Sequence, residues 1–322
     1  MKAFVYGANG AAISELAQPT PKGSQVLVRV RACGLNRADL GMTKGHAHGS
    51  AGGAGTVLGM EWAGEIAEVG PDAKGVKVGD RVMGSGAAAF AEYTLADHGR
   101  LFHAPAEMGF DVAATLPLAL TTMHNALVTI GQLQAGQSVL IQGASSGVGL
   151  MALQIAKLKG AKTVIGSSTD TARRNRLQDF GADLAIDSRD AGWVDQVLKA
   201  TDGNGVDLVI DQVSGNLVNQ NLAATKVLGR IVNVGRLGGT HGDFNFDLHA
   251  ARRISYIGVT FRTRSIEEIR EIFRLVRADI WPAVESGKLR LPIDSTFAFA
   301  DIAAAFARME ANKHLGKIVV TL

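Results

Sequence analysis

The sequence predicts an α/β protein with a doubly wound parallel sheet and a second, mainly β region. Three observations support this prediction. From residue 138 onward, strands and helices alternate in a regular rhythm, which is typical of parallel sheets with helical crossovers. The first third of the chain instead contains short strands separated by turns. Between these regions, an apolar strand runs into a glycine-containing turn that opens a helix.

Length and composition indicate a globular enzyme. The 322 residues suffice for two domains, each with its own core. The net charge of +3 is spread over dispersed basic residues, so we expect no nucleic-acid partner. The single cysteine, Cys33, excludes an internal disulfide and is typical of a reducing cytoplasm, where we expect it as a small buried residue. No apolar run approaches the roughly 18 residues that span a bilayer, and the N-terminus lacks a signal-peptide core, so we expect no membrane partner.

The N-terminal third reads as strands and loops. Alternating apolar and polar residues predict a half-buried strand over 25–34. A Pro/Gly turn divides 64–84 into two strands, and 45–59 is a glycine-rich loop. Apolar residues at helical spacing predict a helix over 111–131 that Pro117 interrupts.

The remainder alternates between the two element types. An amphipathic helix follows residue 265, and the chain ends in a strand over 316–322. Before them, we expect strands over 138–144, 162–168, 206–213, 230–235 and 253–261, and helices over 147–160 and 171–181.

The strand–turn–helix segment 139–161 predicts a dinucleotide site. Measured against G-x-G-x-x-G, Ala144 and Ser146 occupy the first two glycine positions and Gly149 the third. The motif is loose, but a strand before it and a helix after it strengthen the prediction. Such a turn directs backbone N–H groups and the positive end of a helix toward a pyrophosphate.

The tip of the second strand favours NADPH. NAD sites usually place an acidic residue there to bind the ribose 2′-hydroxyl, whereas this strand ends in Ser167 and Ser168. Small hydroxyls admit a 2′-phosphate, and Arg173 and Arg174 follow within one turn to pair with it. We expect Asp170 to cap the following helix.

Two reductase classes do not fit. A short-chain reductase needs a Tyr followed four residues later by Lys, and none of the three Tyr meets this condition. A zinc dehydrogenase needs three protein ligands. His46 and His48 lie in the glycine-rich loop without a third ligand nearby, and His124 on an apolar helix is expected to be a core or cleft histidine.

Successive motifs carry a family resemblance over essentially the whole chain: "VLVRVRACGLNRADL", "GMEWAGEIAEVG", "VGDRVMG", "AEYTLA", "GASSGVG" and "GKIVV". Together they resemble the medium-chain dehydrogenase/reductase superfamily. Its zinc-bearing branch has Cys where this chain has Asn36 and His where it has Met60. The chain therefore resembles the zinc-independent quinone oxidoreductase branch, which includes zeta-crystallins and enoyl reductases. We interpret Met60 as an apolar filler and Glu61 as structural, with no bound metal.

The resemblance implies a GroES-like catalytic domain formed by 1–123 and 262–322, and a Rossmann NADPH-binding domain over 124–261. It also implies a cleft between them that holds the nicotinamide. Relatives commonly form homodimers through sheet edges, and 253–261 is a candidate edge strand.

The resemblance also implies site residues. Asn36 either donates an amide N–H to the substrate carbonyl or shapes its loop, and Thr122 is expected near the nicotinamide ribose. Several quinone reductases have Tyr where this chain has Gly41 and Ser188, so no side-chain proton donor is evident and water is the alternative. The implied cofactor contacts are Ser145, Ser146, Gly147 and Val148 for the pyrophosphate, Arg173 for the 2′-phosphate, and Val234, Gly235 and Phe261 beside the nicotinamide.

The expected activity follows from the missing metal. Without a Lewis acid, alcohol oxidation loses its main electrostatic aid. Hydride delivery from NADPH to an electron-poor carbon remains feasible, with a quinone or an α,β-unsaturated carbonyl compound as acceptor. An enoyl-thioester reductase is an alternative, for which the "FRTR" segment at 261–264 offers a basic channel. A protein that binds NADPH with little turnover is the alternative from another class.

Overall fold

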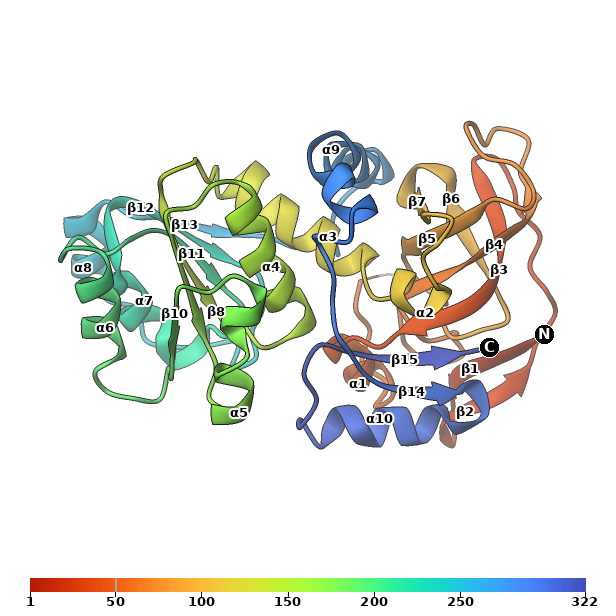
Figure 1. Cartoon of the computed structure of the whole chain (residues 1–322). Coiled ribbons are helices and arrows are strands. Elements are labelled where there is room, and N and C mark those ends of the chain that lie inside the picture. The colour runs from red at the N-terminus through yellow and green to blue at the C-terminus, as the bar shows by residue number, and fades with distance from the viewer. Residues whose placement is uncertain (50) are drawn as a thin grey trace. The chain divides into compact units, whose positions relative to one another are not determined.

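The computed structural model describes residues 1–49 and 51–322. Contacts divide the chain into two compact units, one formed by Met1–Thr121 with Phe261–Leu322 and the other by Thr122–Thr260. At each junction, the domain boundaries expected from the sequence differ from these units by at most two residues. The chain is traced by residue number in Figure 1.

The unit Thr122–Thr260 is built on a six-stranded sheet of order β10-β9-β8-β11-β12-β13, in which every neighbouring pair is parallel. The chain starts at the centre with β8, runs outward to β10, and returns to β11 beside β8. This reversal confirms the predicted doubly wound sheet and creates a switch point at the carboxyl ends of β8 and β11. The strands are β8 Ser138–Gln142, β9 Thr163–Ser167, β10 Leu184–Ile186, β11 Val206–Asp211, β12 Thr225–Asn233 and β13 Ser255–Gly258.

Helices cover both faces of this sheet, with α4 on one face and α6 and α7 on the other (Figure 1). The helix expected over 171–181 is shorter, because α5 ends at Arg174 and a separate 3-10 turn, Leu177–Phe180, follows. That turn ends at Gly181, whose φ of 100° favours glycine. The helices are α4 Gly147–Leu158, α5 Thr171–Arg174, α6 Trp193–Ala200, α7 Val218–Ala224 and α8 Phe246–Arg252.

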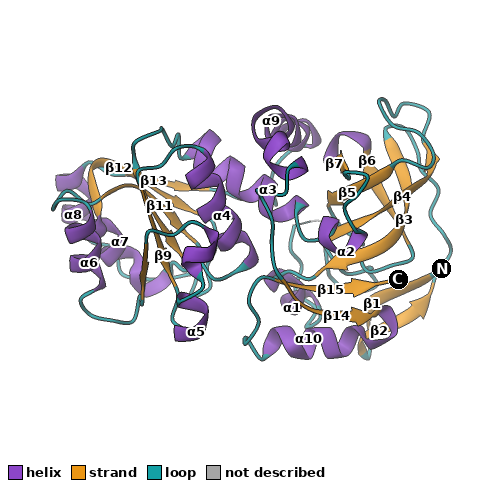
Figure 2. Ribbon diagram, in the orientation of Figure 1, coloured by secondary structure: helices purple, strands orange, loops and turns teal. Residues whose placement is uncertain are grey.

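The other unit contains a mixed seven-stranded sheet of order β14-β15-β3-β4-β5-β7, with β6 pairing to β3 (Figure 2). Only β14 and β15 pair in parallel, and the remaining pairs are antiparallel. A separate hairpin joins β1 and β2. The strands are β1 Lys2–Gly7, β2 Gly10–Glu15, β3 Gln25–Gly34, β4 Glu61–Val69, β5 Arg81–Ser85, β6 Tyr93–Asp97, β7 Leu101–His103, β14 Ile293–Ala298 and β15 Lys317–Thr321.

Pro117 begins a helix instead of interrupting one. It occupies the first position of α3, where the missing N–H of proline does no harm. A π-helical segment, Asn125–Ile130, continues α3. The remaining helices of this part are α1 Arg37–Met42, α2 Phe110–Ala113, α3 Pro117–His124, α9 Ile266–Glu285 and α10 Ile302–Glu310.

The sheet core encloses Cys33 and Met60. Met60 is 7% exposed within a cluster of buried apolar residues, as expected of an apolar filler. Cys33 is fully buried and its Sγ donates to Ala89 O, and burial raises the pKa of its thiol well above the ordinary value. One stretch, Phe110–Ile130, is long and apolar enough by composition to cross a membrane, which the sequence reading did not expect. Of its most apolar window, 72% is buried inside the fold, as in the core helix of a soluble protein.

Candidate functional site

The turn between β8 and α4 is shaped by a serine cap and a required glycine. Ser146 Oγ accepts a hydrogen bond from Gly149 N at 3.1 Å, which caps the first turn of α4. A Cβ on Gly149 would lie 2.7 Å from Ala144 Cα, so only glycine allows the helix to start this close to the strand. The third glycine of the loose motif thus has the packing role that the motif assigns to it.

The start of α4 offers donors to an anion. Within residues 1–49 and 51–322, no acceptor bonds the backbone N–H groups of Gly147 and Val148. They stand at the positive end of a twelve-residue helix. Ser145 Oγ lies beside them and accepts from Ser168 Oγ at 3.0 Å. Two open N–H groups and two hydroxyls at a helix N-terminus fit the pyrophosphate of a dinucleotide.

A buried polar network supports the turn from below. Ser167, 1% exposed, donates from Oγ to Gln142 Oε1 at 2.6 Å and accepts from Gly143 N at 3.0 Å. Gln212 Oε1 accepts from Ser146 Oγ at 3.1 Å. The hydroxyl of Ser167 thus serves this network. We did not identify Gln142 and Gln212 from the sequence, although a buried amide at the end of an apolar strand is a signal for such a network.

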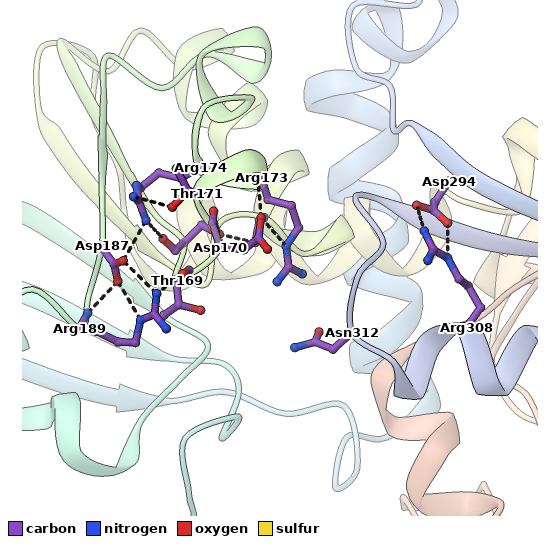
Figure 3. A network of polar contacts seen from close by, with 12 residues as sticks. Thr169, Asp170, Thr171, Arg173, Arg174, Asp187, Arg189, Asp294, Arg308 and Asn312 are labelled. Carbon is purple, nitrogen blue, oxygen red and sulfur yellow. Dashed lines mark hydrogen bonds and ion pairs between the residues drawn. The ribbon is translucent and has the colours of Figure 1, made fainter.

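The tip of β9 carries an arginine cluster (Figure 3). Asp170 caps α5 as predicted, since its carboxylate accepts from Arg173 N at 2.8 Å. The Arg173 side chain, 17% exposed, lies 3.6 Å from the same carboxylate. That backbone bond from Arg173 is the main reason for the lowered pKa of Asp170. Arg174 turns to Ser168 O and Asp187 Oδ2, at 2.9 Å each.

Arg189 is a member of this cluster that the sequence analysis did not identify. Its guanidinium bonds Asp187 at 3.1 and 3.3 Å and also contacts Thr169 O, while its side chain stays 68% exposed. These bonds from Arg189 are the main reason for the lowered pKa of Asp187. The cluster therefore presents three guanidinium groups around two carboxylates. Its position after Ser188, at the end of β10, was the available signal.

The carboxyl ends of β11 and β12 are tied together. Asp211 Oδ1 accepts from Ser214 N at 2.8 Å, and Asp211 O accepts from Val234 N at 2.7 Å. Ser214 has a φ of 59° and donates from Oγ to Gly235 O at 2.7 Å. A Cβ on Gly235 would lie 2.6 Å from Gln212 O, so this crossing requires glycine. The predicted contacts Val234 and Gly235 thus lie in a constrained loop beside the nucleotide turn's own partner, Gln212.

Two other predicted residues lie at the junctions between the units. Thr122 is half-buried on α3, and its neighbour Thr121 bonds Pro117 O at 2.7 Å. Phe261 is half-buried in the bend after β13.

Asn36 meets a buried ion pair. Lys317 Nζ donates to Asn36 Oδ1 at 2.8 Å and also bonds Glu61 Oε2. Asn36 Nδ2 donates to Glu61 Oε2 at 3.1 Å and to Gly34 O at 3.2 Å. The side chains of Lys317 and Glu61 are only 5% and 0% exposed. The sequence analysis did not identify Lys317.

Glu61 has the structural role expected of it. Its second oxygen, Oε1, accepts from Leu118 N at 2.7 Å in the first turn of α3. A carboxylate at this position satisfies an otherwise unpaired N–H and interacts well with the helix dipole. Close by, the fully buried Asp39 of α1 accepts from Asn36 N at 2.7 Å.

We found no group of three His, Cys, Asp or Glu residues suited to a metal ion in the part of the chain that the structure describes. The two positions that carry metal ligands in the zinc-bearing branch hold Asn36 and Met60.

Two family models match the chain. One, described as the alcohol dehydrogenase GroES-like domain, covers residues 22–106, and one described as zinc-binding dehydrogenase covers residues 147–278. Human quinone oxidoreductase is 30% identical over 96% of this chain and 92% of its own length.

Other relatives extend the comparison. A phenolphthiocerol/phthiocerol polyketide synthase chain of Mycobacterium tuberculosis is 31% identical over 96% of this chain, which spans only 14% of that protein's length. A mycobacterial protein solved in complex with NADPH is 25% identical, with both chains fully covered and a TM-score of 0.88. The CurK enoyl reductase is 27% identical, with 99% of each chain covered and a TM-score of 0.85.

Proposed function

Because the chain belongs to the medium-chain dehydrogenase/reductase superfamily, in its zinc-independent quinone oxidoreductase branch, we propose that this oxidoreductase uses NADPH to reduce quinones or activated C=C bonds of α,β-unsaturated carbonyl compounds. The observation that carries the proposal is a contrast. The dinucleotide turn is intact, whereas the metal-ligand positions hold Asn36 and Met60. Bound NADPH supplies the hydride, and an acceptor with its own carbonyl needs no metal to spread the developing charge.

For an enone, the hydride adds to the β-carbon and the electron pair of the C=C bond moves toward the carbonyl oxygen. The enolate then takes a proton from water at the α-carbon. We assign Asn36 to donate an amide N–H to that oxygen and Thr122 to contact the nicotinamide ribose. Val234, Gly235 and Phe261 would bound the nicotinamide.

The cofactor contacts follow from the open donors. Ser145, Gly147 and Val148 would bind the pyrophosphate, with Ser146 holding the helix start. Ser168 and Arg173 would bind the 2′-phosphate, while Ser167 supports the turn through Gln142. An arginine cluster at the tip of β9 supports the preference for NADPH, because charge-assisted bonds to a phosphate dianion are strong.

NADPH oxidation by purified protein tests the activity. A simple quinone, a cyclic enone and an enoyl thioester serve as separate acceptors, each with EDTA present and with NADH for comparison. Turnover that survives EDTA and prefers NADPH is the expected result. Tight NADPH binding without turnover on any acceptor would instead favour a binding protein.

Cofactor preference has its own test. Replacing Arg173 with Ala should raise the KM for NADPH about 10-fold or more, since a charged hydrogen bond contributes about 1.5–3 kcal/mol. The KM for NADH should change little. Arg176→Ala is the control, because Arg176 lies on the same segment and pairs with the exposed Asp179. Equal loss for both cofactors would contradict the assignment.

An enoyl thioester is the second candidate substrate. The similarity to the CurK enoyl reductase over 99% of each chain favours it. Preference for the thioester over the free enone in the assay above would decide for this candidate.

We also infer a cytoplasmic homodimer. Strand β13, Ser255–Gly258, is an edge of the six-stranded sheet, as predicted, so its outer backbone groups are available to a second copy. The single buried thiol accords with a reducing compartment. Light scattering on the purified protein measures the mass, and a monomer at all concentrations would refute the dimer.

A further inference from the structure

The bonds around Asn36 fix the orientation of its amide. A lysine ammonium only donates hydrogen bonds, so the atom facing Lys317 Nζ is the amide oxygen. A carboxylate only accepts them, so the atom facing Glu61 Oε2 is the amide nitrogen. The two contacts agree, which leaves no alternative flip.

The chain is shaped around this pair of charges. A Cβ on Gly34 would lie 3.0 Å from Glu61 Oε2 and 3.2 Å from Lys317 Cε, besides 2.4 Å from Ala114 O. Glycine at this point lets the strand end pass close to the buried ion pair. An exposed ion pair would not require such a backbone approach, and burying two charges is costly unless they do something that apolar residues would not.

The contacts also bias the donor strength of Asn36. The ammonium bonded to Oδ1 withdraws electron density from the amide, which strengthens its N–H groups as donors because linked hydrogen bonds polarise one another. Of the two bonds that Nδ2 makes, the one to Gly34 O, at 3.2 Å, is the longer and goes to an uncharged acceptor. That hydrogen is the one a substrate oxygen would take over, while the bond to Glu61 holds the other.

We propose that Lys317 is a positioning residue for the reduction, which orients and polarises the Asn36 amide so that Nδ2 donates to the substrate carbonyl oxygen. This inference rests on the proposed function. It predicts that Lys317 contributes most where the acceptor is least electron-poor. A strongly electron-poor quinone accepts hydride readily without help, whereas a simple cyclic enone depends on polarisation of its carbonyl.

The test uses a double variant, Lys317→Met with Glu61→Gln, so that no buried charge is left without a partner. Gln keeps an oxygen for Leu118 N, and Met keeps the unbranched volume of Lys. Lys317→Arg, which keeps the charge, is the conservative variant. Lys44→Met is the matched control, since Lys44 forms an exposed ion pair with Glu310.

The double variant should lower kcat on the cyclic enone by about 10- to 100-fold, less than the loss of a full oxyanion-hole donor because Asn36 itself remains. Its loss on an electron-poor quinone should be several-fold smaller. The kinetic isotope effect with NADPH deuterated at the transferred position should rise on the enone. Lys317→Arg should recover most of the enone rate, and Lys44→Met should match the wild type.

The ratio of the two rates on one sample decides the question, because it does not depend on the fraction of protein that is folded. Equal losses on both acceptors with an unchanged isotope effect would mean a purely structural ion pair and would overturn the inference, as would wild-type rates in the double variant. In both cases wild-type turnover would leave the proposed function standing. Absence of wild-type turnover on every acceptor would refute both.

Discussion

Asp39 offers a direct test of the electrostatics beside the ion pair, through the substitution Asp39→Asn. The carboxyl is fully buried on α1, its Oδ2 accepts from Asn36 N, and Oδ1 has no partner among the described residues. Burial raises its pKa from 3.8 to about 7. The bond from Asn36 and the charge of Lys317 lower the pKa, and Glu61 raises it further, but desolvation dominates.

The sign of the pH dependence follows from which state holds the proton. Between about pH 4 and pH 7 the folded protein keeps the proton that the unfolded chain has released, so stability falls as the pH rises through this window. A rise of about three in the pKa corresponds to about 4 kcal/mol. The loss is absent below about pH 4 and complete above about pH 7. The amide in Asp39→Asn cannot ionise, so the substitution removes this loss.

Urea unfolding at pH 5, 6, 7 and 8 measures the effect. Because the amide in Asp39→Asn adds a buried N–H group without an acceptor, we expect a constant penalty of about 1–3 kcal/mol. On top of it, the difference from wild type should move by about 3 kcal/mol in favour of the variant between pH 5 and pH 8. Asp202→Asn, at an exposed position, is the control. Parallel stability curves for wild type and Asp39→Asn would refute the reasoning.

Three further substitutions test the packing and pairing. Gly34→Ala should lower the free energy of unfolding by about 2 kcal/mol or more, since its Cβ would lie 2.4 Å from Ala114 O, and urea denaturation measures this loss. Ser146→Ala should cost about 1 kcal/mol by removing the α4 cap, and a melting temperature equal to wild type would contradict that role. Arg270→Met removes two bonds to Asp97, whose pKa lies at about 2 because those bonds and others outweigh the opposing effect of burial. The stabilisation is present above about pH 4 and lost as the pH falls through 2, so urea midpoints of variant and wild type should differ at pH 6 and converge near pH 2.

The sequence was informative where a local pattern determines the structure. The strand over 25–34 matches β3, and the helix after residue 265 matches α9, whose Ser265 and Glu268 form a reciprocal cap. The cap of α5 by Asp170 followed from residue type alone. The short elements β10, α6, α7 and α8 were not predicted, because their few residues gain most of their stability from tertiary packing.

The candidate site divides along the same line. The residues of the nucleotide turn are contiguous, so a motif reveals them. The amides beneath it, Gln142 and Gln212, come from different strands and meet only because β8 and β11 are neighbours in the sheet. Arg189 joins the arginine cluster from the end of β10, beside β9, by the same mechanism.

The contact between Lys317 and Asn36 joins residues 281 positions apart, and a single register determines it. Strand β15 runs antiparallel to β3, with Val319 opposite Gly34 and Leu35 N bonded to Ile318 O. Lys317 is the next residue toward the start of β15, so it lies beside the backbone that continues past β3 into Asn36. A slip of one residue would turn this side chain to the other face of the sheet. The same pairing that buries Ile318 and Val320 therefore brings a cation to the position where the zinc-bearing branch has a metal ligand.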